Sequence, residues 1–123
     1  KKGYFLAPTV LENVSPDSDF SKKEIFGPVV VLYAVRNFEE ALKYASHSKY
    51  KLASAIHTQD INRAMEFARR HNAGVVQING PTHGSEPHMP FGGMELSGNG
   101  WMEPGTAALD FYSNWKQVRV DAF

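Results

Sequence analysis

The spacing of apolar and polar positions predicts strands and helices in alternation along this chain. The run at residues 29–35 (VVVLYAV) is continuously apolar and β-branched, which is typical of a strand buried on both faces. Asn37 follows it as a candidate helix N-cap, with Glu40 three positions later. Behind that cap, an apolar stripe at helical spacing predicts an amphipathic helix; it consists of Phe38, Ala41, Leu42 and Ala45.

The same order then repeats. Residues 52–56 predict a short strand, and Asp60 predicts a helix cap. The second apolar stripe consists of Ile61, Ala64, Met65 and Ala68, and the basic run 69–71 fits the last helical turn, which Gly74 would close. Residues 75–78 predict a third strand. Short connections between these elements favour an α/β fold, a parallel sheet of βαβαβ units flanked by helices.

The remaining segments are less regular. Residues 4–11 are β-prone, but Pro8 moves that strand to an edge or breaks it, and residues 15–23 are typical of a loop. Residues 79–105 are rich in glycine and proline and predict one long loop. After it we expect a short helix at 106–112 and an alternating edge strand at 115–120. Residues 113–123 are therefore interpreted as a C-terminal strand that follows the domain formed by residues 1–112.

Composition excludes several kinds of partner. Thirteen basic residues balance thirteen acidic ones among the 123, so no net charge attracts nucleic acid, and no apolar run has the length of a membrane span. We expect neither nucleic acid nor membrane as a partner. The absence of cysteine excludes disulfides and makes a cytoplasmic location the expectation. Because the sequence starts at Lys1 rather than at methionine, we also expect a processed, excised or engineered start.

Two motifs carry a family resemblance. The run EIFGPV begins at Glu24, and PFGG begins at Pro90, some sixty residues later. Together with the strands between them, they resemble the C-terminal portion of the aldehyde dehydrogenase superfamily over essentially the whole chain. The run NGPT at 79–82 is weakly similar to enzymes acting on aromatic aldehydes or 2-oxoglutarate semialdehyde. The resemblance implies that residues 1–112 are part of a catalytic domain and that residues 113–123 are an oligomerisation strand. It also implies NAD or NADP as cofactor, oxidation of an aldehyde to a carboxylate, and a homo-oligomer that pairs through the last strand.

The resemblance also implies roles for individual residues. Glu24 matches the glutamate that binds the nicotinamide-ribose hydroxyls, and Phe26 matches an aromatic residue near the nicotinamide. Phe91 matches a substrate-tunnel residue, while His83 and Met89 fall in the variable wall of that tunnel. The structural alternatives are a solvated loop charge for Glu24 and core packing for Phe26 and Phe91.

The family's nucleophile is missing from these residues. A cysteine thiolate attacks the aldehyde carbonyl and allows hydride to leave, and this sequence has no cysteine, so we expect no catalytic residue here and no activity of the chain alone. The alternative function is a stand-alone noncatalytic module for self-association or partner binding. Lys51, Glu95 and Met102 also depart from the usual glycine, lysine and arginine, which predicts disturbed docking of the long loop.

One further cluster could in principle bind zinc. His83, Glu86 and His88 form an H-x-x-E-x-H pattern, but this spacing fits neither a helical HExxH site nor a zinc finger. We interpret these residues as polar loop side chains and predict no metal site.

Overall fold

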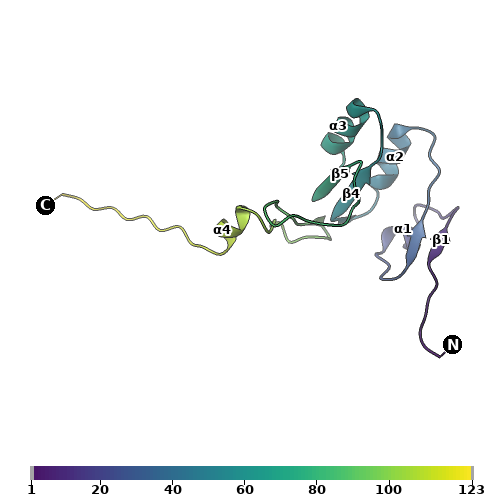
Figure 1. Ribbon diagram of the computed structural model, residues 1–123, viewed down its shortest axis with the longest axis horizontal. Coiled ribbons are helices and arrows are strands. Elements are labelled where there is room, and N and C mark those ends of the chain that lie inside the picture. Colours follow the sequence, from purple (N-terminus) through teal and green to yellow (C-terminus); the bar gives the residue numbers. More distant parts are fainter. Residues whose placement is uncertain (1, 123) are drawn as a thin grey trace.

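A computed structural model describes residues 2–122. The chain forms an α/β unit from which the C-terminal segment extends away (Figure 1). Strand β1 (Thr9–Leu11) pairs in parallel with β2 (Val29–Val31), and β4 (Ala53–Ile56) pairs in parallel with β5 (Val75–Ile78). Strand β3 (Tyr50–Lys51) pairs antiparallel with β6 (Met94–Glu95). The α/β class with parallel strand pairs is thus confirmed, with the strands divided among three two-stranded sheets.

The two main helices begin where their capping residues predict. Helix α2 (Phe38–Ala45) follows Asn37, whose side-chain oxygen accepts the backbone N–H of Glu40 at 3.0 Å. Helix α3 (Ile61–Arg70) follows Asp60, whose carboxylate accepts the N–H groups of Asn62 and Arg63. Both caps satisfy N–H groups that lack a partner within the helix.

A small core forms where α2 and α3 cover β4 and β5 (Figure 1). Its buried apolar side chains are Leu42, Ala64, Phe67 and Ala73. His71 is also buried; its ring stacks on Phe67 with centroids 4.8 Å apart, and its Nδ1 lies 3.3 Å from Ser46 Oγ. The burial lowers the pKa of His71, and the charge of Lys51 lowers it further.

Several details of the sequence prediction are wrong. The strand expected over 29–35 ends at Val31, and Val30 and Leu32 are each 51% exposed, because β2 pairs only with β1 and its outer face is uncovered. The segment 15–23 contains a four-residue helix, α1 (Asp19–Lys22). Helix α3 ends at Arg70 and is followed by the extended backbone of its C-cap His71, so Gly74 does not close it.

One of the basic residues that end α3 forms ion pairs with both helices. Arg70 donates to Glu39 on α2 and to Glu66 on α3, at 2.6 Å in each ion pair. This arrangement lowers the pKa of Glu39 and raises that of Arg70. The guanidinium therefore joins the two helices at the surface.

The C-terminal part has little regular structure. The expected short helix is present as α4 (Ala107–Phe111). The strand expected at 115–120 is not formed: residues 113–122 carry no strand or helix assignment and are exposed (Figure 1). A strand requires a hydrogen-bonded neighbour, and within residues 2–122 this segment pairs with none.

Candidate functional site

An open groove of about 460 Å³ contains Glu24, the first of the predicted site residues. Three separate segments form its walls. The first wall is Lys23 and Glu24, the second comes from β3 and its flanks, and the third is Leu96 and Ser97 after β6. The second wall consists of Ser48, Tyr50, Leu52 and Ala53. The groove therefore contains the carboxylate of Glu24 and the hydroxyl groups of Ser48 and Ser97 in its lining.

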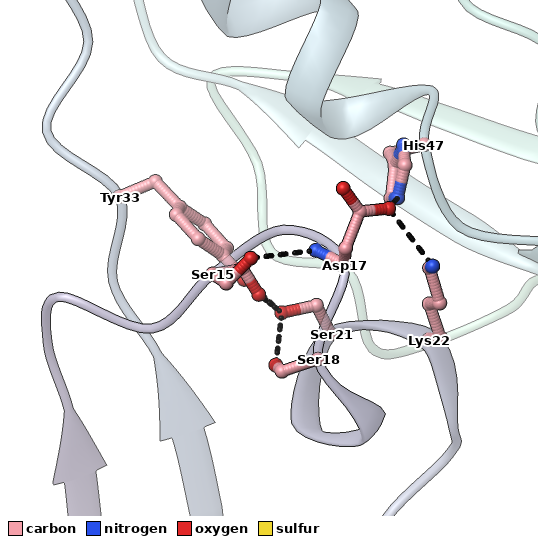
Figure 2. A network of polar contacts seen from close by, with 7 residues as sticks. All are labelled: Ser15, Asp17, Ser18, Ser21, Lys22, Tyr33 and His47. Atoms are coloured by element: carbon pink, nitrogen blue, oxygen red, sulfur yellow. Dashed lines mark hydrogen bonds and ion pairs between the residues drawn. The ribbon is translucent and has the colours of Figure 1, made fainter.

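A polar network fixes the segment that precedes the first wall (Figure 2). Asp17 accepts a hydrogen bond from Lys22 Nζ at 2.8 Å, and His47 Nε2 lies 3.8 Å from the same carboxylate. The hydrogen bond and charge of Lys22 lower the pKa of Asp17, and His47 adds to that effect. Because His47 directly precedes Ser48, this contact connects the α1 segment to the second wall.

Through hydroxyl groups, the same network reaches Tyr33, which lies two residues after β2. The Ser21 hydroxyl is hydrogen-bonded to the Tyr33 hydroxyl and donates to the backbone oxygen of Ser15 at 2.8 Å (Figure 2). Tyr33 in turn packs against Tyr44 of α2, with ring centroids 5.2 Å apart. The residues before Glu24 are thus connected through Tyr33 to the segment that follows β2 and to α2.

Lys23 does not neutralise its neighbour Glu24. Its Nζ forms an ion pair with Asp19 Oδ2 at 2.8 Å, and this hydrogen bond and charge raise the pKa of Lys23. With the ammonium group directed to α1, Glu24 provides the acceptor oxygens at this side of the groove.

The second and third walls are joined by backbone and side-chain contacts. The N–H of Leu96 donates to the oxygen of Lys49 at 3.1 Å, and the N–H of Lys51 donates to Ser97 Oγ at 3.0 Å. Lys51 Nζ also lies 2.9 Å from Glu95 Oε1. The long loop is therefore docked onto β3, and two of the three departures noted in the sequence contact each other.

Glycine packing completes the docking. A Cβ atom on Gly74 would overlap the carbonyl oxygen of Gly92 and lie 2.7 Å from its carbonyl carbon. A Cβ atom on Gly93 would likewise overlap the backbone of Ser97, and one on Gly98 would overlap the backbone of Gly93. Only residues without a side chain allow these backbone segments to approach so closely. The PFGG motif thus packs against the residue that precedes β5.

A second, smaller cavity of about 80 Å³ brings two other predicted residues together. Met89 and Phe91 both line it, with residues of β5 and of the loop. The other lining residues are Val75, Gln77, Gly84, Ser85, Glu86 and Pro90. His83 is exposed and does not belong to this lining. Phe91 is also held by two backbone hydrogen bonds to Glu103, at 2.7 and 2.8 Å.

Sequence reasoning missed Gln77. It is the polar residue within the otherwise apolar strand β5 (VVQI), and that interruption was the available signal. Its presence in the lining gives the cavity an amide able to donate and accept hydrogen bonds.

Phe26 lies outside the groove lining and is 93% exposed. A tight turn explains its position, since the N–H of Gly27 donates to the oxygen of Ile25 at 2.8 Å. The chain is therefore not extended through Phe26, and the expected shared side with Glu24 does not bring the ring into the groove.

The alternative chemistries can be placed as well. In the part of the chain that the structure describes, no group of three or more acidic or histidine side chains is arranged to hold a metal ion. His88 Nδ1 lies 3.9 Å from Glu86 Oε2, and both side chains are largely exposed. Within residues 2–122, no helix has the length and hydrophobicity to cross a membrane.

The parallel strand pairs, their covering helices and the docked glycine-rich loop define part of an α/β domain with its site between loop segments. The chain belongs to the aldehyde dehydrogenase family, whose model matches residues 1–118. It is 45% identical over 120 residues to aldehyde dehydrogenase [NAD(P)+] 2 of Saccharomyces cerevisiae, covering 98% of this chain and 23% of that protein.

Other relatives agree with the resemblance seen in the sequence. Alpha-ketoglutarate semialdehyde dehydrogenase of Haloferax volcanii is 43% identical over 117 residues, which cover 94% of this chain and 24% of that protein. The crystal structure of the NAD-dependent aldehyde dehydrogenase from Sinorhizobium meliloti superimposes with a TM-score of 0.86 at 33% identity, covering 96% of this chain and 23% of that one. The chain thus spans about a quarter of the length of these relatives.

Proposed function

We propose that this chain forms the part of an NAD(P)-dependent aldehyde dehydrogenase that binds the nicotinamide ribose and borders the aldehyde. The groove around Glu24 carries the proposal, because a carboxylate with serine hydroxyls nearby can accept both hydroxyl protons of a ribose diol. The cofactor, when bound, would accept the hydride from the substrate. The oxidation of aldehyde to carboxylate is assigned to a protein that also contains a thiolate and a site for the rest of the dinucleotide.

The substrate side is assigned to the small cavity. Met89 and Phe91 would contact the aldehyde's side chain, and Gln77 would offer it a hydrogen bond. The relatives named for 2-oxoglutarate-type semialdehydes support a short, polar aldehyde as the substrate class. Phe26 is proposed to meet the nicotinamide only when another segment covers its exposed ring.

The chain alone is expected to be inactive, because it has no cysteine to form the covalent intermediate. Purified protein mixed with NAD and a panel of aldehydes should produce no NADH above a protein-free blank. A steady, heat-labile increase in NADH absorbance would contradict this expectation.

Ribose binding is tested separately from turnover. Nicotinamide mononucleotide or NAD should bind more weakly than about 1 mM, since only one end of the dinucleotide has a site here. In NMR titrations, the amide shifts should centre on the three groove walls and disappear in Glu24→Gln. Glu12→Gln, which changes an exposed glutamate that does not line the groove, is the matched control. Binding that is micromolar, or unchanged by Glu24→Gln, would refute the assignment.

A second function is favoured by the exposed C-terminal segment. Trp115, Val118 and Val120 are 92%, 72% and 84% exposed, on a stretch that has no strand partner within residues 2–122. Such a segment can pair with an edge strand of another copy. We therefore propose homo-oligomerisation through residues 113–123, most simply as a symmetric dimer.

Light scattering over a dilution series tests this proposal. The mass should exceed the 13.7 kDa of one chain and should decrease on deletion of residues 115–123. A monomer at every concentration would refute it. Association without any ribose binding would favour the stand-alone noncatalytic module over the dehydrogenase site.

A further inference from the structure

The ion pair between Lys51 and Glu95 is more buried than the other ion pairs of the described residues. The Lys51 side chain is 13% exposed and that of Glu95 is 44% exposed. In the other ion pairs within residues 2–122, the basic side chain is at least 36% exposed, and His47 has the lowest of these values. A shielded ammonium loses hydration and needs a close anion, so this pair should matter more than a solvated one.

The strand pairing around this ion pair is very short. Strands β3 and β6 have two residues each, with Tyr50 opposite Glu95 and Lys51 opposite Met94. So short a ladder is not stable by itself in water. Side-chain links must therefore contribute to holding the third wall of the groove against the second.

The backbone at Glu95 supports the same interpretation. Its φ angle is +50°, in the left-handed region that glycine and asparagine adopt more readily than glutamate. A residue with a long side chain persists there when its surroundings hold it in place. The side-chain contact that Glu95 makes is the ion pair between its carboxylate and Lys51.

We propose that Lys51 and Glu95 are positioning residues of the groove. Their ion pair holds Leu96 and Ser97, which follow Glu95 directly, against the β3 side of the site that contains Glu24. The inference rests on the proposed ribose-binding function for its biological meaning. The positioning itself is a property of this chain and can be measured without any ligand.

Amide hydrogen exchange of Leu96 is the direct measurement, because this N–H donates across the junction to Lys49. Glu95→Lys, Glu95→Gln and Lys51→Glu should each accelerate its exchange by about tenfold, a typical coupling for residues in contact. The doubly exchanged variant, Lys51→Glu with Glu95→Lys, should restore protection to within about threefold of the wild type.

Two controls separate positioning from general destabilisation. Asp121→Lys makes the same charge change in an exposed pair with Arg119 and should leave Leu96 unaffected. Amides of α3 should remain protected in all variants. If Glu95→Lys unfolds the chain, the neutral Glu95→Gln and the doubly exchanged variant still test whether the ion pair positions Leu96. Unchanged exchange in Glu95→Gln, or no recovery in the double exchange, would overturn the proposal.

A titration with nicotinamide mononucleotide distinguishes this inference from the proposed function. If both are correct, affinity should fall about tenfold in Glu95→Gln and recover in the double exchange. If Leu96 responds as expected but the wild type shows no groove shifts, the ribose assignment fails and the positioning stands. If groove shifts occur while Leu96 is insensitive, the positioning fails and the ribose assignment stands.

Discussion

Replacing Gly74 by alanine should displace the long loop from its docked position on the sheet. The φ angle of Gly74 lies outside the left-handed region, so an alanine backbone is allowed there. Its new Cβ, however, would overlap the Gly92 carbonyl oxygen and lie 3.1 Å from Gly93 Cα. These are backbone atoms, and no side-chain rotation can relieve the overlap. The loop must therefore move by about 1 Å or more.

The magnitude follows from what that movement breaks. The Leu96-to-Lys49 and Lys51-to-Ser97 hydrogen bonds are both shorter than 3.2 Å and would not survive such a shift. Each contributes about 1 kcal/mol, and overpacking typically costs about 1–3 kcal/mol. We expect the free energy of unfolding to decrease by about 3–5 kcal/mol, unless the loop detaches and leaves the rest folded.

Urea unfolding followed by circular dichroism, with amide exchange of Leu96, distinguishes these two outcomes. Gly80→Ala is the matched control, because its nearest neighbour, Gln77 Oε1, lies at an ordinary 3.5 Å. That variant should remain within about 0.5 kcal/mol of the wild type. If Gly74→Ala showed both an unchanged midpoint and a protected Leu96, backbone contact would not be what docks the loop.

Two further predictions concern the helices and the core. Asn37→Ala removes the acceptor for the Glu40 N–H and should reduce the free energy of unfolding by about 1 kcal/mol, whereas Asn37→Asp should retain most of it; equal stability of the two variants in urea would contradict the capping role. The pKa of His71 is lowered below its ordinary 6.5, so the unfolded chain binds the proton more readily than the folded one. Stability should be highest above about pH 6.5 and decrease below it until the folded-state pKa is reached. His71→Phe should flatten this part of the urea-midpoint profile, and an unaltered profile would show that another group causes the decrease.

The parts of the fold that could be predicted are those with local causes. Asn37 and Asp60 accept N–H groups two or three residues ahead, so the start of each helix is determined by residues within one helical turn of the cap. The strand pair β4–β5 follows from its apolar segments and from the helix between them. Such signals need no knowledge of the rest of the molecule.

The parts that could not be predicted depend on contacts between distant segments. Strands β3 and β6 are too short to show periodicity and lie more than forty residues apart. Val30 and Leu32 have the pattern of a doubly buried strand, yet their exposure is decided by what covers β2. The same holds for residues 115–120, whose alternation predicts a strand but whose partner is not found within residues 2–122.

In the candidate site, too, the sequence predicted features with local signals but not those that depend on contacts between distant segments. The motif beginning at Glu24 located one groove residue, and the motif at Pro90 located the loop, but neither indicated that Gln77 would line a cavity with Phe91. Motifs identify residues, whereas walls arise from the approach of separate segments. Here that approach is made by glycine backbones at 74, 92, 93 and 98 and by the Lys51–Glu95 pair. Because the glycines set how closely the loop approaches and the ion pair sets its register on β3, altering either should displace Leu96 and Ser97 while Glu24 stays in place. A groove whose walls can be moved separately in this way allows the ribose assignment and the loop positioning to be tested apart.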